Sequence, residues 1–346
     1  MRLWTVILFA TSLYAQTIQS SHTTENLRGL STPAPDVAWA SGTHGTYLRT
    51  TDGGHTWLPA QVPGAESLDF RDVEAFNADL AYLLAAGPGE KSRIYKTTDA
   101  GKTWSLQFSN PDPKGFFDCM AFWNPDHGIA LGDPVNNKFE LISTQDGGKT
   151  WKPMPIGKLP PAIAGEGAFA ASGTCIAVQG KKNAWFVTGG KAARVFRSTD
   201  AGESWTVSEA PIVHGPDSAG IFSIAFRDAR HGVIAGGDYQ QPEKDGPNLA
   251  LTNDGGRSWQ PAAISPQWYF SAVVFTTHMA RTAQARPQRS STILALGSAH
   301  AACAGITATK WQQVWDLNLN AASLSPAGEL FAVGPKGLIV RVATNR

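Results

Sequence analysis

The sequence predicts an all-β fold, a β-propeller in which seven four-stranded antiparallel blades form a ring. Three observations predict it. An eight-residue turn pattern recurs five times along the 346 residues, and short stretches of alternating character precede its copies. The chain also contains 35 Gly and 22 Pro, which favour turns and disfavour helices. Four strands per repeat of this length are typical of a propeller blade.

The repeated turn has the form S/T-x-D-x-G-x-S/T-W. We expect its Asp carboxylate to accept backbone N–H bonds and its second Gly to supply a positive φ. The Trp then begins the next strand and buries its ring. These roles are structural, and they fall to the following residues: Asp52, Trp57, Asp99, Trp104, Asp146, Trp151, Asp200, Trp205, Asp254 and Trp259.

Three strands precede the turn in each unit, and one follows it. The strand directly before the turn is expected at residues 47–49, 94–96, 139–142, 195–197 and 249–251. Two earlier strands are expected at 73–76 and 80–85, at 119–122 and 128–131, and at 222–226 and 232–235. We name the four strands A to D in chain order, so that the repeated turn joins C to D.

The blade count comes from the ends of the repeat. Trp311 marks a sixth unit after a degraded turn. A seventh unit begins at 320–325, which resembles 26–31, and it stops after its third strand. Residues 16–23 are the natural source of the missing strand D, because they precede the first blade and would remove the open sheet edge. We therefore expect one seven-bladed domain over residues 16–346.

The first fifteen residues have the pattern of a secretory signal peptide. Arg2 is followed by an uncharged apolar run over 3–13, and Ala15 offers a small residue for cleavage. The run is shorter than the roughly 20 residues of a membrane span, although an uncleaved anchor is the alternative. We expect an exported protein, periplasmic or extracellular, with no transmembrane segment once the signal is removed.

The cysteines and the charge exclude several classes of site. Cys119, Cys175 and Cys303 lack zinc-ligand spacing, so we expect three buried apolar side chains, with a Cys119–Cys175 disulfide as the alternative. No metal and no cofactor are expected. Lys and Arg number 29 against 28 Asp and Glu. This near balance argues against a nucleic-acid partner, which would favour a basic surface.

Candidate binding residues gather on one face of the ring. In a blade of this kind the A–B and C–D turns share one face, and the longer B–C and D–A connections share the other. We expect a mixed-charge site at the channel mouth on the second face, since loops on a rigid scaffold commonly carry function. Its candidates are Arg28, Arg71, Asp72, Asp118, Asp133, Glu166, Arg194, Asp238 and Tyr239.

The structural alternative is that these residues are solvated rim groups or ion pairs between blades. Asp72 and Asp118 each lie four residues before a Phe, Phe76 and Phe122. We therefore place the two carboxylates at equivalent positions in neighbouring blades.

The repeated turn resembles the Asp-box (BNR) repeat of sialidases, some glycoside hydrolases, sortilin-type receptors and the photosystem II stability/assembly factors of the Ycf48 type. The spacing, the single propeller and the expected export are most similar to the last group. That resemblance implies a non-enzymatic, chaperone-like protein that binds a protein or other macromolecular client during assembly of a membrane complex.

A sialidase-like glycoside hydrolase is the alternative function. The Arg-Ile-Pro-type motif of sialidases is missing, because the first strand reads Leu27-Arg28-Gly29-Leu30. A hydrolase acting on carbohydrate with two carboxylates stays open, with Asp72, Asp118 or Asp133 as catalytic candidates. Such chemistry requires carboxyl groups about 5–10 Å apart.

Overall fold

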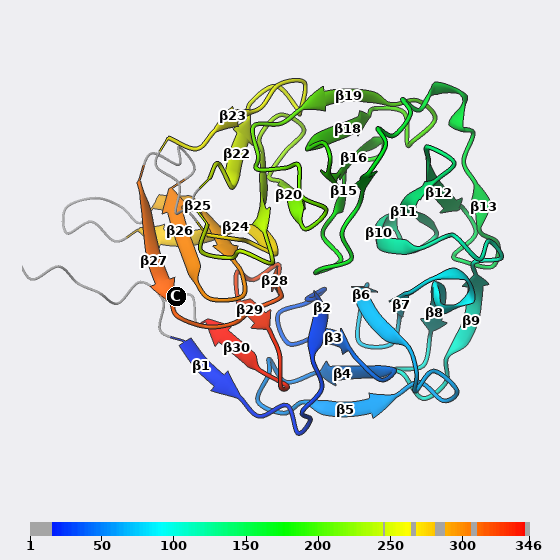
Figure 1. Cartoon of the computed structure of the whole chain (residues 1–346). Helices are drawn as coiled ribbons and strands as arrows, with labels where there is room; N and C mark the ends of the chain where they lie inside the picture. Colours follow the sequence, from blue (N-terminus) through cyan, green and yellow to red (C-terminus); the bar gives the residue numbers. More distant parts are fainter. Residues whose placement is uncertain (1–15, 245, 264–267, 281–287, 306–309, 343–346) are drawn as a thin grey trace, which may run out of the picture.

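The computed structural model describes residues 16–244, 246–263, 268–280, 288–305 and 310–342. These residues form seven antiparallel sheets arranged in a ring, as predicted (Figure 1). The expected signal peptide over 1–15 lies outside the described residues. In the described part of the chain no helix has the length and apolarity that crossing a membrane requires.

Each of the first six blades contains four strands in chain order, with the first of the four nearest the centre of the ring (Figure 1). Blade 1 contains β2 (Leu27–Ser31), β3 (Ala38–Gly42), β4 (Thr46–Thr50) and β5 (Leu58–Gln61). Blade 2 contains β6 (Asp69–Ala75), β7 (Ala81–Ala86), β8 (Arg93–Thr97) and β9 (Ser105–Ser109). Blade 3 contains β10 (Phe117–Asn124), β11 (His127–Val135), β12 (Lys138–Thr144) and β13 (Lys152–Pro153). Blade 4 contains β15 (Ile176–Gln179), β16 (Asn183–Val187), β18 (Arg194–Ser198) and β19 (Thr206–Glu209).

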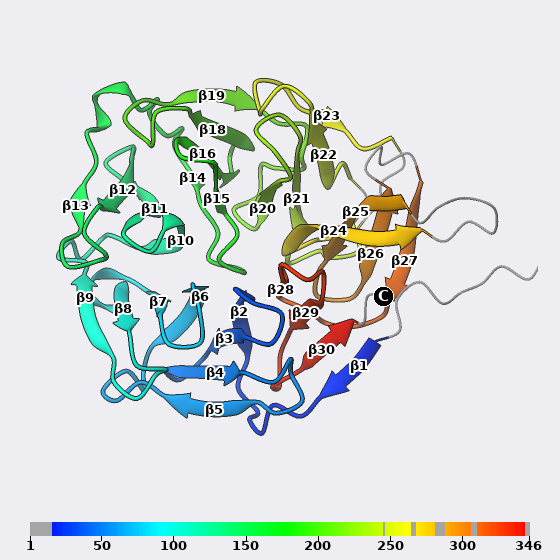
Figure 2. The ribbon, with the colours of Figure 1, turned by 180° about the vertical axis from the view of Figure 1, so that it is seen from behind.

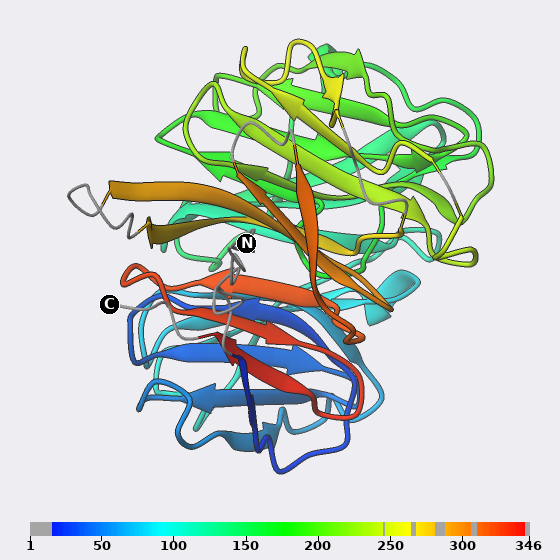
Figure 3. The same cartoon turned by 90° about the vertical axis from the view of Figure 1, so that its left-hand side faces the viewer.

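The remaining blades follow the same order. Blade 5 contains β20 (Ala219–Phe226), β21 (Gly232–Asp238), β22 (Leu249–Thr252) and β23 (Gln260–Pro261), and its sheet is extended at the inner edge by β17 (Gly189–Gly190) and β14 (Glu166–Gly167). Blade 6 contains β24 (Ala272–Ala280), β25 (Gln288–Leu296), β26 (Ala301–Gly305) and β27 (Trp311–Trp315). The nine-residue strands β24 and β25 extend beyond their neighbours in the side view (Figure 3). Two 3-10 turns, η1 (Gly89–Lys91) and η2 (Ile156–Lys158), lie in connections.

The ring closes through the two ends of the described chain. Blade 7 contains β28 (Ala321–Leu324), β29 (Leu330–Val333) and β30 (Ile339–Val342), and its outer strand is β1 (Gln16–Gln19). The register runs antiparallel from Gln16 opposite Val342 to Gln19 opposite Ile339. Seen from behind, β1 again lies beside β30 at the rim (Figure 2). The predicted closure by the N-terminal strand is confirmed.

All five repeated turns are built from the same hydrogen bonds. In the first, Asp52 Oδ1 accepts the Thr56 N–H at 2.9 Å, and Thr50 Oγ1 accepts the Gly54 N–H at 2.9 Å. Gly54 has φ +83°, and a Cβ there would lie 2.6 Å from the Phe331 ring, so the position requires glycine. The carboxylate bonds recur at Asp99, Asp146, Asp200 and Asp254.

The tryptophans that end these turns fill the spaces between blades. Trp57, Trp151, Trp205 and Trp259 are buried, and Trp104 is partly buried against Tyr47, with ring centroids 5.1 Å apart. Trp57 meets the ring of Phe331 from blade 7 edge to face at 5.8 Å. The turn therefore fixes a strand reversal and also anchors one blade to the next.

A disulfide joins blades 3 and 4. Cys119 of β10 is bonded to Cys175, which directly precedes β15, with the two Cα atoms 6.0 Å apart. The expectation of three unbonded, buried cysteines is therefore wrong for two of them, and the alternative pairing holds. Cys303 lies outside the bridge and is buried. Sequence could not decide this, because the pairing depends on how two neighbouring blades pack.

Backbone hydrogen bonds assign the connections to two faces. The Gly53 N–H of a C–D turn donates to Asp36 O of the A–B loop in the same blade at 2.9 Å. On the other side the Gly45 N–H of a B–C turn donates to Leu68 O of the D–A connection at 2.8 Å. We call the first side the turn face and the second the loop face.

Candidate functional site

A pocket of about 630 Å³ opens where inner strands and loop-face connections from around the ring meet. We call it the mouth pocket. Its lining comprises Arg28, Arg71, Phe116, Asp118, Asp133, Ala168, Phe169, Ala170, Ala171, Phe222, Tyr239, Tyr269, Ser298, Asn318, Asn320 and Pro335. Five of the nine predicted site residues are among them: Arg28, Arg71, Asp118, Asp133 and Tyr239.

β-Bulges place the principal side chains in this pocket. The register of the inner strand shifts at Arg28, Arg71, Asp118 and Phe222, so each is an extra residue without a partner in the ladder. A bulge redirects its side chain and leaves the rest of the ladder intact. Asp133 occupies a similar shift in β11. The pocket is therefore lined at equivalent positions by different chemistry from blade to blade.

The same register corrects one prediction. Asp72 pairs with Leu84 directly after the bulge of blade 2, whereas Cys119 pairs with Leu131 directly after the bulge of blade 3. Asp118 is thus equivalent to Arg71, and Asp72 is equivalent to Cys119. The Phe-based alignment was wrong by one residue because Phe122 is equivalent to Ala75 and not to Phe76.

Two arginines form one side of the mouth pocket. Arg71 Nε donates to Asp69 Oδ2 at 2.6 Å, and its Nη1 donates to Ala170 O at 2.7 Å. Arg28 Nε is buried, and it makes no hydrogen bond within the described chain. Burial, followed by the positive charge of Arg71, lowers the pKa of Arg28. An arginine remains protonated under such a shift, so Arg28 offers an unused donor.

Two carboxyl groups form another part of the wall. Asp118 is 1% exposed, and its Oδ2 has no hydrogen-bond partner in the described part of the chain. Asp133 Oδ1 accepts the Ala168 N–H at 2.9 Å. Burial and the nearby charge of Asp133 raise the pKa of Asp118 well above its usual range. Burial also raises the pKa of Asp133 to about 6.

Aromatic rings complete the lining. Phe169 stacks on Phe222 with ring centroids 3.9 Å apart and planes inclined by 7°. Tyr269 and Tyr239 meet Phe222 edge to face at 4.8 Å and 6.2 Å. Tyr239 is 50% exposed, so a large apolar surface with a hydroxyl is open to a ligand. Sequence reasoning missed Phe169, Phe222 and Tyr269. The bulge position shared by Arg28, Arg71 and Phe222 could have revealed Phe222 only once the register was known.

Glu166 and Arg194 form a buried ion pair away from the pocket lining. Arg194 Nε donates to Glu166 Oε1 at 2.8 Å, and Arg194 Nη2 also bonds to Glu166 Oε2 and donates to Pro161 O at 2.9 Å. The Ile163 N–H donates to Glu166 Oε2 at 2.8 Å. The pair thus holds the long connection between blades 3 and 4 in place. Its role is that of a structural ion pair, which was the alternative to a binding site for these residues.

Asp72 and Asp238 are also buried outside the lining. Asp72 Oδ2 accepts the Met120 N–H at 2.7 Å, which joins blade 2 to blade 3. Burial, followed by the charge of Glu74, raises the pKa of Asp72 well above its usual range. Asp238 Oδ1 accepts the Gln240 N–H at 3.0 Å and shapes the turn that presents Tyr239. Both carboxyl groups hold backbone in place.

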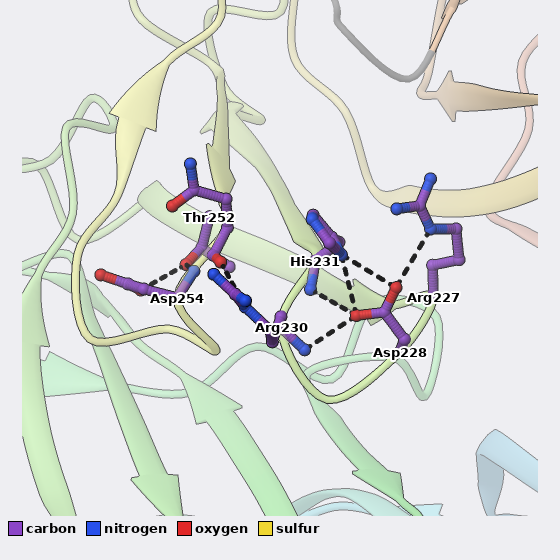
Figure 4. A network of polar contacts seen from close by, with 7 residues as sticks. Arg227, Asp228, Arg230, His231, Thr252 and Asp254 are labelled. Carbon is purple, nitrogen blue, oxygen red and sulfur yellow. Dashed lines mark hydrogen bonds and ion pairs between the residues drawn. The ribbon is translucent and has the colours of Figure 1, made fainter.

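The turn face has a different character. A smaller pocket of about 350 Å³ lies there beside Arg227, His231 and Phe275. Figure 4 shows that the polar groups next to it bond to one another. Asp228 Oδ1 accepts the N–H groups of Arg230 and His231, each at 2.9 Å, and Asp228 also bonds to the His231 ring. Nor do the described residues contain a group of three His, Cys, Asp or Glu side chains that could hold a metal ion.

Solved structures of other propellers are similar to this chain over almost its whole length. Ycf48 from Cyanidioschyzon merolae has 18% identity and a TM-score of 0.64, covering 95% of this chain and 98% of that one. A structure described as Ycf48 bound to D1 peptide has 17% identity and a TM-score of 0.60, covering 96% and 97%. A streptogramin B lyase has 13% identity and a TM-score of 0.66, covering 96% and 98%.

No family model matches the sequence, and no curated protein matches it. The similar structures include a lyase as well as Ycf48, and a shared fold does not imply a shared activity. At these identities the likeness establishes that the chain has a β-propeller fold.

Proposed function

We propose that this protein is a non-enzymatic binding protein that holds a segment of another protein in the mouth pocket. One observation carries the proposal: the pocket contains a buried donor, Arg28 Nε, and a buried acceptor, Asp118 Oδ2, that no described residue satisfies. Buried polar groups ordinarily have partners, so these two atoms are suited to a ligand that supplies both. The open ring of Tyr239 adds an aromatic anchor of the kind common in binding sites.

A peptide fits the mixed chemistry of this pocket. Backbone and side chains of a peptide offer acceptors for Arg28, donors for Asp118 and apolar surface for Phe222 and Tyr239. The similar Ycf48 structure described as bound to D1 peptide supports a peptide ligand by analogy of fold. An assembly role, with a client held during construction of a larger complex, is the form of this function that we propose.

We also propose that the protein is exported. Residues 1–15 have the signal-peptide pattern. The Cys119–Cys175 disulfide supports an oxidising compartment such as the periplasm or the cell exterior. Fractionation of the native cells, followed by N-terminal sequencing, should yield a mature chain that begins at Gln16. A chain that retained Met1 in the reducing compartment would contradict export.

Peptide selection tests the binding function. The mature protein is immobilised and panned against a random-peptide phage library, in parallel with an Arg28→Gln/Tyr239→Ser variant and an Asp254→Ala control on the turn face. We expect enriched peptides that bind the wild type and the control alike and bind the mouth variant about tenfold more weakly. Equal binding by all three proteins, or no enrichment, would reject a peptide site in the mouth pocket.

A two-carboxylate glycoside hydrolase is the second candidate. Asp118 and Asp133 line the same pocket, and a carboxyl with a pKa of about 6 could serve as a general acid. Asp72 is less suited, because its carboxylate is bonded to backbone away from the pocket lining. Hydrolysis of any substrate in a glycan panel, abolished by Asp133→Asn, would favour this candidate over the binding protein.

A further inference from the structure

The carboxyl side of the mouth pocket defines what part of a ligand it accepts. This inference rests on the proposed binding function and concerns the chemistry of the bound segment. Asp118 is almost fully buried, lines the pocket and has one oxygen, Oδ2, without a partner in the described chain. Asp133 lines the same pocket and uses only Oδ1, for the Ala168 N–H. Asp118 Oδ2 and Asp133 Oδ2 are thus without a hydrogen-bond partner among the described residues.

No cation within the described chain is paired with these carboxylates. Arg71, whose charge acts on Asp118, bonds instead to Asp69 and to Ala170 O. Its charge lowers the pKa of Asp118, but burial and the charge of Asp133 raise it by more. Burying an unpaired carboxylate is costly, so this arrangement is best stabilised by a cation that arrives with the ligand.

The aromatic lining favours an organic cation. Phe169 directly follows Ala168, the donor to Asp133, and it lines the same pocket as both carboxyl groups and stacks on Phe222. Aromatic faces attract ammonium groups, most strongly where water is excluded. A bare metal ion would be bound less well, because the described residues contain no group of three side chains that could coordinate it.

The geometry points to a primary ammonium group, from a lysine side chain or a peptide N-terminus, bound between Asp118 and Asp133. A guanidinium binds best to both oxygens of one carboxylate, whereas Asp133 Oδ1 already accepts the Ala168 N–H and the backbone of Ala170 already bonds to Asp118. An ammonium has three donors that can be divided between two acceptors. The carboxyl pair is thus an ammonium subsite within the larger peptide site.

Binding of an ammonium should be linked to pH. The charged groups that act on Asp133 and Asp118 are Glu140 of β12, Arg71 of β6 and the two carboxyls themselves. The ammonium favours the ionised carboxylates, so binding releases protons wherever they were protonated. Affinity should therefore rise between pH 5 and pH 7, across the pKa of about 6 for Asp133.

The test uses three small probes and the mature protein in ligand-observed NMR titrations. Nα-acetyl-lysine N-methylamide carries a side-chain ammonium, Nα-acetyl-norleucine N-methylamide is its neutral match, and norleucine N-methylamide carries an N-terminal amine. We expect at least one of the two charged probes to bind about tenfold more tightly than the neutral probe. Which of them binds more tightly identifies the source of the ammonium.

Variants assign the preference to the proposed residues. Asp118→Asn and Asp133→Asn should each abolish the preference for the charged probe. Asp126→Asn, an exposed carboxyl on the turn face of the same blade, should keep it. Thermal melts establish that each variant is folded, and titrations at pH 5 should show a smaller preference than at pH 7.

Equal binding of the neutral and charged probes would overturn the ammonium subsite, as would a preference retained in both Asp118→Asn and Asp133→Asn. If the peptide selection fails but the titrations show a clear preference for the lysine probe, the peptide function is rejected and the ammonium subsite stands. If peptides are enriched but their binding depends on neither a lysine nor an N-terminal amine, the ammonium subsite is rejected and the peptide function stands.

Discussion

The repeated turns and the mouth pocket differ in how their carboxyl groups are hydrogen-bonded. On the turn face Asp52, like the other repeated aspartates, accepts bonds from its own turn, and Asp228 is bonded to its neighbours. On the loop face Arg28 Nε and Asp118 Oδ2 are buried without partners in the described chain. A satisfied group stabilises the fold, whereas Arg28 and Asp118 line a pocket in which a ligand could supply the missing partners. The repeated face is therefore architecture, and the variable face is where recognition is expected.

The difference has a structural origin in the blade. Each repeated turn is closed by residues within one octapeptide, so its Asp, its second Gly and its hydroxyl residues cannot vary freely without loss of its hydrogen bonds. A bulge residue such as Arg71 or Phe222 takes no part in the ladder. Its side chain can change from blade to blade at little structural cost. Substitutions on the two faces should therefore differ in their effects on folding and on binding.

The largest expected effect is on the satisfied ion pair of the loop face. Arg194→Met leaves Glu166 buried without its cation and should lower the free energy of unfolding by about 4 kcal/mol. Urea denaturation followed by tryptophan fluorescence measures this. The double variant Glu166→Gln/Arg194→Met should recover part of the loss. A change below about 1 kcal/mol in the single variant would show that the fold does not depend on this pair.

The disulfide should have the next largest effect. Replacing Cys119 and Cys175 by alanine removes a cross-link that spans 56 residues and should cost about 3 kcal/mol in unfolding free energy. Cys119 directly follows Asp118, so peptide binding should weaken as well. Dithiothreitol should reproduce both effects in the wild type and have no effect on the variant. Unchanged stability after confirmed reduction would contradict a structural role of the bridge.

The third prediction separates the two faces directly. Asp254→Ala removes the acceptor of the Thr252 hydroxyl and the Ser258 N–H and should cost about 1 kcal/mol. Peptide binding should be unaffected, because the turn lies on the opposite face. The measurement pairs a denaturation curve with a binding titration on the same sample. Loss of binding in a folded Asp254→Ala protein would break the division between the faces.

The smallest expected effect is a difference in pH dependence. Hydrogen bonds from Thr56 lower the pKa of Asp52 to about 2, so its contribution is present above the unfolded pKa and is lost as pH falls toward 2. The pKa of Asp133 is raised to about 6, so its effect on stability depends on pH in the opposite direction. Its ionisation lowers the stability of the fold as pH rises from about 4 to about 6.

Thermal melts of Asp133→Asn and the wild type between pH 4 and pH 7 measure how the ionisation of Asp133 changes stability. The variant cannot ionise and its amide oxygen can still accept the Ala168 N–H, so its melting temperature relative to the wild type should increase across this range. Asp126→Asn serves as the exposed control. A relative melting temperature that fell with rising pH would show that Asp133 is stabilised by its charge within the fold.

Sequence determined the parts of this protein that depend on local bonding. The octapeptide turn, the four-strand unit, the count of seven blades and the closure by an N-terminal strand within residues 16–23 were all predictable. Each follows from residues close together in the chain or from a missing strand. The same reasoning placed the candidate residues on one face. Sequence could not show which candidates bind a ligand. Glu166 and Arg194 are charged residues of the kind found in binding sites, but in the structure they bond to each other.

Tertiary structure alone decided which side chains meet. Whether Asp118 or Asp72 reaches the pocket depends on one bulge, and a shift of one residue reverses the direction of a side chain. The Cys119–Cys175 bridge and the Phe169–Phe222 stack likewise depend on the packing of blades that are distant in sequence. The architecture follows from a short sequence pattern that is repeated along the chain. The pocket is formed by single, non-repeated positions that only the closed ring brings together.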